Sequence, residues 1–254
     1  MSAGVPGFGL DGKTAIVTGA NTGIGQAIAV ALSQAGARIV CVGRSPMDET
    51  CEKIGHDHAG VLSVTADLST TGDHARIVEE TLSWSGGIDI LVNNAGIIRR
   101  NDAIDFTEDD WDAVVDTNLK SAFFLSQAVA RQMIPHGRGK IVNVASLLSF
   151  QGGIRVASYT ASKSGLAGLT KLLANEWAGQ GVNVNAIAPG YVATNNTEAL
   201  RNDAGRYEAI LARIPAGRWA EPADIAGAAV FLASPAADYV HGITLPVDGG
   251  WLAR

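Results

Sequence analysis

The chain has 254 residues, of which 47% are hydrophobic and 17% are charged, and its formal net charge is −6. This composition can fill a large apolar core, which excludes intrinsic disorder as the main state. The negative charge argues against nucleic acid as a partner, and no apolar run approaches the ~18 to 20 residues of a transmembrane helix. Two cysteines, Cys41 and Cys51, are too few for a disulfide framework, and no Cys/His cluster indicates a metal site. We expect a cytoplasmic protein with neither nucleic-acid nor membrane partners and no metal.

Short β-branched or apolar runs alternate with longer segments of helical periodicity. In chain order, the runs that predict strands are 14–18, 38–42, 61–65, 88–92, 140–145, 183–187 and 243–247. Helical segments include 25–35, 107–134, 159–177 and 224–233. This alternation predicts a single α/β domain over residues 1–254, a doubly wound parallel sheet of about seven strands with helices on both faces.

The least patterned stretch lies at residues 191–220, where Asn, Arg and Gly are frequent and only a short helix is expected. A long excursion between the last two strands of such a sheet is typical of a lid over a binding site. Ligands of open α/β sheets bind beyond the carboxyl ends of the strands. The residues that follow each strand are therefore the first candidates for a site.

The segment TGANTGIG directly follows the first predicted strand. Gly19, Gly23 and Gly25 would let the backbone turn tightly and approach a pyrophosphate closely. A helix that begins near Ile24 would add free N–H donors and a positive dipole end. The same glycines also suit a tight strand-to-helix turn that binds no ligand.

Two later turns at this edge offer further contacts to a dinucleotide. Asp67 follows the third predicted strand and either accepts a hydrogen bond from an adenine amino group or caps the next helix. The tetrapeptide Asn93-Asn94-Ala95-Gly96 ends the fourth strand, where it either lines a cofactor groove or only shapes a turn.

The end of the second predicted strand indicates which cofactor is used. An acidic residue there binds the ribose hydroxyls of NAD, whereas an arginine accommodates the 2′-phosphate of NADP. The order here is Val42-Gly43-Arg44-Ser45, with no carboxylate before Asp48. This favours NADP, with NAD possible. The alternative is that Arg44 is a solvated loop charge.

Tyr159 and Lys163 are four residues apart in the helical segment YTASK, so both side chains project from one face. A nearby ammonium favours the phenolate form and brings the tyrosine hydroxyl toward a useful acid/base range. Ser146, just beyond the fifth strand, can hold a substrate oxygen beside it. Asn118 can kink its helix and hold a water that connects Lys163 to solvent. A Tyr and a Lys at this spacing also occur by chance on surface helices.

Together, the glycine turn, the NNAG tetrapeptide, the serine and the YTASK segment occur in an order that resembles the short-chain dehydrogenase/reductase family over residues 13–250. The resemblance implies a Rossmann fold, a homotetramer and a catalytic tetrad of Asn118, Ser146, Tyr159 and Lys163. The cofactor-binding residues that it implies are Gly19, Asn21, Thr22, Gly23, Ile24, Gly25, Arg44, Asp67, Leu68, Asn94, Ala95, Gly96, Tyr159, Lys163, Pro189, Gly190, Val192 and Thr194.

From residue 93 onward the chain is similar to one branch of that family, the 2-dehydro-3-deoxy-D-gluconate 5-dehydrogenases, also described as 2-deoxy-D-gluconate 3-dehydrogenases. The shared stretches are NNAGIIRR, SFQGGIRVASYTASKSG, NAIAPGYVATNN, RIPAGRWAEP and VDGGWLAR. This implies hydride transfer between a nicotinamide and a sugar acid. The Gly43-Arg44 pair departs from what an NAD-using member of the branch would carry.

Other functions fit the same residues. A gluconate 5-dehydrogenase or a 3-oxoacyl-carrier reductase would use the same tetrad, so only the substrate pocket distinguishes them. A dinucleotide sensor without a reaction is the alternative outside the enzyme class. Such a sensor would not need Ser146, Tyr159 and Lys163 together.

Positive side chains near the ligand edge predict an acidic substrate. Arg99 and Arg100 follow the fourth strand, and Arg155 lies four residues before Tyr159. Because a guanidinium pairs with a carboxylate in two parallel hydrogen bonds, we expect Arg155 to bind the carboxylate, with Arg99 as the next candidate. Gln151 can bond a sugar hydroxyl. For Arg99 and Arg100 the alternative is a solvated loop charge.

Overall fold

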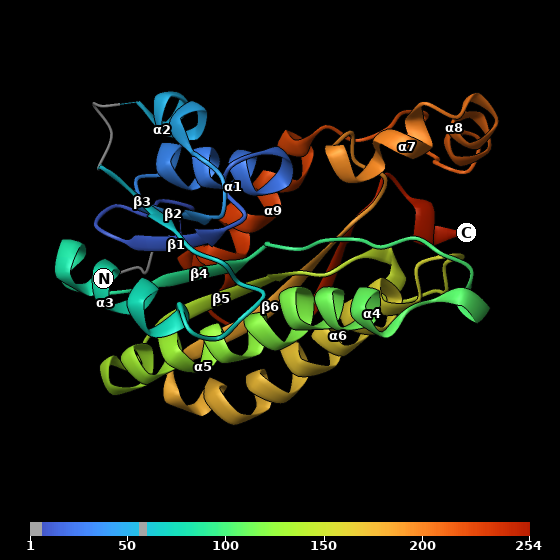
Figure 1. Ribbon diagram of the computed structural model, residues 1–254. Coiled ribbons are helices and arrows are strands. Elements are labelled where there is room, and N and C mark those ends of the chain that lie inside the picture. The colour runs from blue at the N-terminus through green and yellow to red at the C-terminus, as the bar shows by residue number, and fades with distance from the viewer. Residues whose placement is uncertain (1–6, 56–59) are drawn as a thin grey trace.

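Parallel strands form one sheet at the centre of the structure (Figure 1), a computed structural model that describes residues 7–55 and 60–254. The strands are β1 (Thr14–Thr18), β2 (Arg38–Gly43), β3 (Val61–Thr65), β4 (Ile90–Asn93), β5 (Gly139–Val144), β6 (Val182–Pro189) and β7 (Thr244–Val247). Their order across the sheet is β3-β2-β1-β4-β5-β6-β7, and every pairing is parallel. The doubly wound sheet is confirmed, and its switch point lies between β1 and β4.

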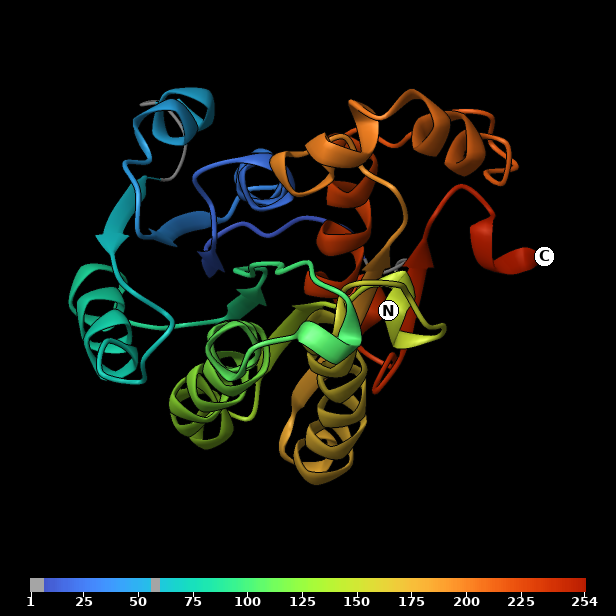
Figure 2. The same cartoon turned by 45° about the vertical axis from the view of Figure 1, so that its right-hand side comes forward.

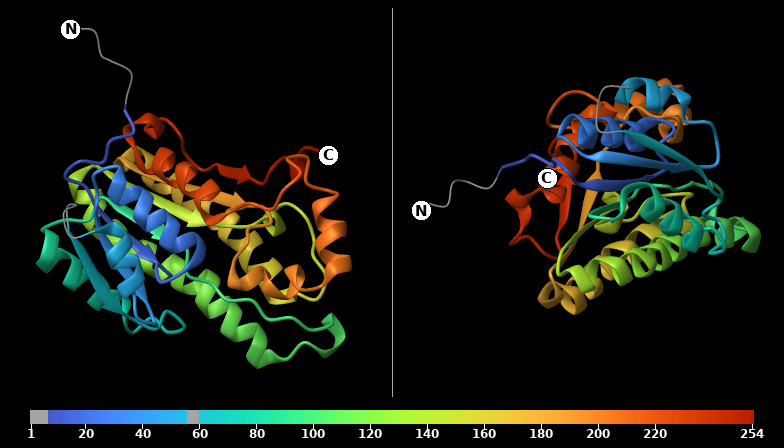
Figure 3. Two further views of the ribbon diagram at one scale, coloured as in Figure 1. Left: turned by 90° about the horizontal axis from the view of Figure 1, so that it is seen from above. Right: turned by 90° about the vertical axis from the view of Figure 1, so that its left-hand side faces the viewer.

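Helices cover both faces of this sheet (Figures 1 and 3). On one face lie α1 (Gly23–Gln34), α2 (Asp48–Ile54) and α9 (Pro222–Ala233), with α1 packed along α9. On the other face lie α3 (His74–Ser85), α4 (Glu108–Val115), α5 (Ser121–Met133) and α6 (Ala157–Trp177). No helix within the described residues has the length and apolar character needed to cross a membrane.

The core has two layers, one on each side of the sheet. Successive side chains of a strand point to opposite faces, so Val17 of β1 packs in the α1–α9 layer and Ile16 packs beneath α3 and α5. All residues of β1 and β6 are buried. Because both faces are covered, the central strands read as continuous apolar runs, which is why the sequence located them well.

The predicted helix over 107–134 is one helical path with a distortion in the middle. Between α4 and α5, residues Asp116–Lys120 form a π-helical turn around the buried side chain of Asn118. Such turns insert one extra residue and are frequent at functional sites. A local kink was expected at Asn118 from the sequence, and the structure has a π turn at this position.

The segment 191–220 contains two short helices, α7 (Glu198–Arg201) and α8 (Ala204–Leu211), where we expected only one. Its two ends meet in a parallel bridge between Val192 and Ala220. The segment stands beyond the carboxyl end of β6, beside the C-terminal turn Trp251–Ala253 (Figure 2). We call residues 191–220 the insertion.

Candidate active site

The turn between β1 and α1 is built from glycines and one asparagine of the neighbouring strand. Gly19 and Gly23 have φ values of 64° and 58°, which residues other than glycine rarely adopt. A Cβ on Gly25 would collide with the carbonyl of Gly19 and the side-chain amide of Asn94. That amide donates hydrogen bonds to the carbonyls of Thr18 (2.9 Å) and Gly19 (3.2 Å). Asn94 therefore joins β1 and β4 at the switch point.

A groove runs over this turn along the carboxyl ends of the strands. Two adjoining hollows form it and share Gly19, Asn21, Ala95 and Gly96. The predicted cofactor residues that line it are Gly19, Asn21, Thr22, Gly23, Ile24, Gly25, Arg44, Asp67, Leu68, Asn94, Ala95, Gly96 and Thr194. Val192, at the start of the insertion, does not line the groove, because its side chain is buried in the core layer of α1 and α9.

Asp67 is at one end of this groove and does not cap a helix. The N-cap of α3 is Asp73, and Asp67 instead accepts a hydrogen bond from the backbone N–H of Ser69 at 2.9 Å. This bond, followed by the charge of Arg44 among smaller causes, lowers the pKa of the Asp67 carboxyl. The capping alternative is wrong, and the carboxylate faces the same hollow as Arg44.

Ser146, Tyr159 and Lys163 meet where β5 ends and α6 begins. Ser146 caps the short turn Leu147–Ser149, with its Oγ accepting a hydrogen bond from Leu148 N at 3.2 Å. The Lys163 Nζ lies 5.7 Å from the centroid of the Tyr159 ring and donates to the carbonyl of Val144 at 2.6 Å. The predicted juxtaposition on one helix face is present, and β5 positions the serine beside it.

The ionisation of this group differs from the sequence-based expectation. Burial raises the pKa of the Tyr159 phenol, while a hydrogen bond to Ser146 and the charge of Arg100 lower it. Burial also lowers the pKa of Lys163 to about 8. The overall direction for the Tyr159 pKa is upward, whereas from the sequence we expected a neighbouring ammonium to lower it.

Asn118 is fixed by the loop that follows β4. Its Oδ1 accepts from Ile97 N at 2.8 Å, and its Nδ2 donates to Ile97 O at 2.9 Å. A Cβ on Gly96 would stand 3.1 Å from Asn118 Oδ1 and 3.7 Å from Lys163 Nζ. Gly96 therefore leaves open the narrow space between the asparagine and the lysine.

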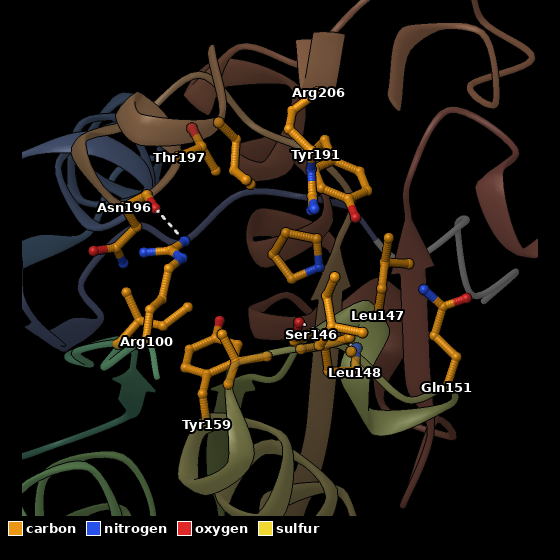
Figure 4. A pocket seen from close by; sticks show the side chains of 17 residues that line it. Arg100, Ser146, Leu147, Leu148, Gln151, Tyr159, Tyr191, Asn196, Thr197 and Arg206 are labelled. Atoms are coloured by element: carbon orange, nitrogen blue, oxygen red, sulfur yellow. Dashed lines mark hydrogen bonds between the residues drawn. The ribbon is translucent and has the colours of Figure 1, made fainter. Parts of the chain in front are cut away.

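A pocket opens above Tyr159 (Figure 4). In this view Ser146 and Tyr159 lie at its lower side, and Asn196, Thr197 and Arg206 of the insertion lie at its upper side. Pro189 and Gly190 also line it. Asn196 of the insertion lines both this pocket and the groove. A ligand in the groove and a second ligand in the pocket would therefore be neighbours.

The chain is similar to known proteins over nearly its whole length. A family model described as enoyl-(acyl carrier protein) reductase matches residues 19–252. The 2-dehydro-3-deoxy-D-gluconate 5-dehydrogenase of Dickeya dadantii is 60% identical over 97% of this chain and 98% of its own. A provisionally named 2-deoxy-D-gluconate 3-dehydrogenase from Agrobacterium tumefaciens, solved with bound NADP, is 61% identical with a TM-score of 0.91, over 97% of this chain and 99% of its own. A gluconate 5-dehydrogenase from Burkholderia cenocepacia, solved with NADP and tartrate, is 40% identical with a TM-score of 0.92, over 97% and 98%.

The chain belongs to the short-chain dehydrogenase/reductase family. Its matched region contains the groove, the serine at the end of β5 and the Tyr-Lys pair on α6. The family resemblance drawn from those motifs is confirmed.

Two arginines of this short-chain dehydrogenase do not lie where the sequence placed them. Arg155 has a φ of 63° and its Nε pairs with Asp102 Oδ1 at 3.2 Å. Arg99 pairs in the same way with Asp110 Oδ1 at 3.1 Å. Neither lines the pocket. In this structure both side chains contact a carboxylate outside the pocket, and the expectation that Arg155 or Arg99 binds the substrate carboxylate stays a prediction.

Gln151 does line the pocket, but its oxygen is already bonded. Its Oε1 accepts a hydrogen bond from the indole Nε1 of Trp251 at 3.2 Å. Its amide nitrogen and the second lone pair of the oxygen are left to reach a sugar hydroxyl. The loop after β5 is thereby attached to the C-terminal turn.

Arg100 and Arg206 line the pocket instead. The sequence places Arg100 near the ligand edge together with Arg99, but it was not chosen there to bind the carboxylate. Arg206 was missed, because it lies in α8 of the insertion, where the sequence carries no clear periodicity. The available signal was its presence in the predicted lid.

Proposed function

We propose that this short-chain dehydrogenase transfers hydride between NADP and a sugar acid of the 2-dehydro-3-deoxy-D-gluconate or 2-deoxy-D-gluconate type. The observation that carries the proposal is the pair of hydroxyls, Ser146 and Tyr159, in a pocket that adjoins the groove. The names of the similar proteins support the substrate class.

The groove fits a dinucleotide. Gly19, Gly23 and Gly25 line the groove without side chains, so the backbone at the start of α1 is accessible to a pyrophosphate. Arg44 and Ser45 are at the far end, where a 2′-phosphate needs a positive charge and hydroxyl donors. When bound, the cofactor supplies or accepts the hydride.

The chain's own residues handle the proton. Tyr159 Oη would give its proton to the substrate oxygen during reduction and take it back during oxidation. Ser146 Oγ would hold that same oxygen by a hydrogen bond. Lys163 lies beneath the phenol, and its lowered pKa lets it exchange protons near neutral pH. We propose that Asn118, through its two hydrogen bonds to the backbone of Ile97, keeps that backbone out of the path by which protons would pass between Lys163 and solvent.

The insertion would act as a lid, since Asn196, Thr197, Leu200 and Arg206 lie over the pocket. We further propose a cytoplasmic homotetramer, which the family resemblance supports. Light scattering of the purified protein would test the assembly, with a mass of four times 26.2 kDa expected.

The reduced-nicotinamide absorbance band tests the proposal directly. A panel of hydroxy and keto sugar acids, an acyl-carrier thioester and gluconate would each be assayed with both cofactors. We expect the fastest turnover with a deoxy or dehydro-deoxy sugar acid and NADP. Faster turnover of the thioester or of gluconate would favour a carrier reductase or a gluconate 5-dehydrogenase. Cofactor binding without any turnover would indicate a sensor.

A further inference from the structure

Arg100 and Arg206 reach one pocket from two different parts of the molecule. Arg100 comes from the loop after β4, and Arg206 comes from the first turns of α8 in the insertion. Figure 4 shows the first beside Asn196 and the second beside Tyr191, with both guanidinium groups above the Tyr159 ring. The core and the insertion therefore each contribute one positive charge to the same space.

Neither guanidinium is neutralised. Within residues 7–55 and 60–254, Arg100 and Arg206 form no ion pair, although the neighbouring Arg99 and Arg155 each have a carboxylate partner. Arg100 loses hydration at the pocket, and the charge of Arg206 adds to the effect in lowering its pKa. Two like charges that share a pocket favour the binding of an anion between them.

The contacts of Arg100 indicate how such an anion would be held. Its Nη2 donates to the carbonyl of Asn196 at 3.0 Å, which already attaches the core loop to the insertion (Figure 4). The other donors of the planar guanidinium remain available for a carboxylate. Arg206 would complete the site from the opposite side when the insertion lies over the pocket.

We propose that Arg100 and Arg206 form a carboxylate subsite at the far end of the substrate pocket, and that the bound carboxylate holds the insertion closed by bridging them. The inference rests on the proposed function and names the part of the site that selects acids. It replaces Arg155 and Arg99 in that role. A neutral sugar would contact the same hydroxyls but would leave the two guanidinium groups unbridged.

The subsite also has a consequence for the groove. Asn196 accepts the Arg100 hydrogen bond and lines the groove beside Thr194. A carboxylate that holds this end of the insertion would slow the departure of a dinucleotide. Acid binding and cofactor retention should therefore be coupled in this protein.

Arg100→Gln and Arg206→Gln test the subsite, with Arg155→Gln as the matched control from the same rim. Kinetic constants would be measured with the sugar acid and with its neutral methyl ester. Each pocket variant should raise KM for the acid by roughly 10- to 100-fold, the effect of losing a charge-assisted hydrogen bond, and change the ester constants by less than about threefold. The control should stay within about twofold for both substrates. A larger effect of Arg155→Gln, or an equal loss for the ester, would overturn the proposal.

A second readout does not depend on catalysis. Amide hydrogen exchange over residues 195–211 would be followed without cofactor, with the acid, the ester or a sugar phosphate added. We expect the acid to slow exchange in the parent and not in Arg206→Gln. Equal protection by the ester or by the phosphate would overturn the carboxylate assignment. If the parent binds the acid with protection yet turns nothing over, the proposed function fails while the subsite stands.

Discussion

The indole of Trp251 donates a hydrogen bond to Gln151 Oε1 at 3.2 Å, so the C-terminal turn holds the loop that borders the substrate pocket. The same ring lies 4.8 Å from the ring of Tyr191 and 3.9 Å from the guanidinium carbon of Arg213, measured to the centroid. Trp251 is buried. One side chain near the end of the chain thus joins the insertion, the loop after β5 and the wall of the pocket.

Trp251 variants should separate packing from hydrogen bonding. Trp251→Ala removes a large buried ring and should lower the free energy of unfolding by about 3 to 5 kcal/mol. Trp251→Phe keeps most of the packing but loses the hydrogen bond to Gln151. It should lower the free energy of unfolding by only about 1 kcal/mol and should raise KM, because the loop that borders the pocket is less well held. Urea unfolding and steady-state kinetics measure both effects. A Trp251→Phe protein with the parent KM would show that this bond does not position the loop.

Tyr159→Phe should remove nearly all turnover and leave NADP affinity almost unchanged. The ring still packs in the pocket, but no proton can be transferred to the substrate oxygen. Fluorescence titration with NADPH and the absorbance assay give the two values. Tyr239→Phe is the matched control, because Tyr239 is 99% exposed and far from the pocket in sequence and fold. Residual activity of Tyr159→Phe within a few-fold of the parent would contradict the mechanism.

Lys163 should make stability depend on pH in the alkaline range. Its pKa is lowered from 10.5 to about 8 by burial, so below pH 8 the folded protein bears the cost of a buried ammonium. From about pH 8 to 10.5 the unfolded chain binds the extra proton, and the free energy of unfolding rises with pH, by at most about 3 kcal/mol. Above that range the contribution is constant.

Lys163→Met supplies the comparison for this pH effect. Chemical unfolding of both proteins between pH 7 and about 10.5 should show the parent gaining stability relative to the variant. The difference between the two curves isolates Lys163 from the other groups that titrate there. Parallel curves would mean that the folded protein leaves the lysine pKa near its ordinary value.

Arg44→Ala should narrow the preference for NADP over NAD by weakening NADP selectively. Arg44 lines the groove with Ser45, and a charge-assisted bond to a phosphate is roughly twice as strong as a neutral one. Arg138→Ala, an exposed arginine that lines neither the groove nor the pocket, serves as the control. Titrations with both cofactors measure the ratio of affinities. A preference for NAD in the parent would show that Arg44 does not read the phosphate.

The sheet was predictable because strands that are buried on both faces appear in the sequence as short continuous apolar runs. Each predicted strand is present, with ends within two residues of those expected. The proximity of Ser146, Tyr159 and Lys163 was predictable for a similar reason, since Tyr159 and Lys163 share a helix and Ser146 follows a strand end. These relations are set by neighbours in the sequence and by the sheet.

The pair of arginines that lines the pocket was not predictable in this way. Arg155 is close to Tyr159 along the chain, yet a left-handed backbone and Asp102 turn its side chain outward. Arg206 is far from Tyr159 in sequence and reaches the pocket only because α8 folds back over it. The direction of a loop side chain depends on contacts with residues that are distant in the sequence, and hydrophobic periodicity does not predict such contacts.

Gly25→Ala should disrupt the turn between β1 and α1, although alanine is usually the better helix residue. Gly25 has an ordinary helical position in α1, but a Cβ there would overlap the carbonyl of Gly19 and the amide of Asn94. To relieve this overlap the turn must move away from β4, which costs about 1 to 3 kcal/mol and breaks the hydrogen bonds of Asn94.

Gly227→Ala is the matched control. Gly227 is an exposed glycine inside α9, and a Cβ there would meet nothing within 4 Å, so this substitution should stabilise the protein by about 0.5 to 1 kcal/mol. Thermal unfolding and NADP titration distinguish the two: Gly25→Ala should lose both stability and cofactor affinity, while the control keeps its affinity. If Gly25→Ala binds NADP with the affinity of the parent, cofactor binding does not depend on the backbone geometry that Gly25 allows at this turn.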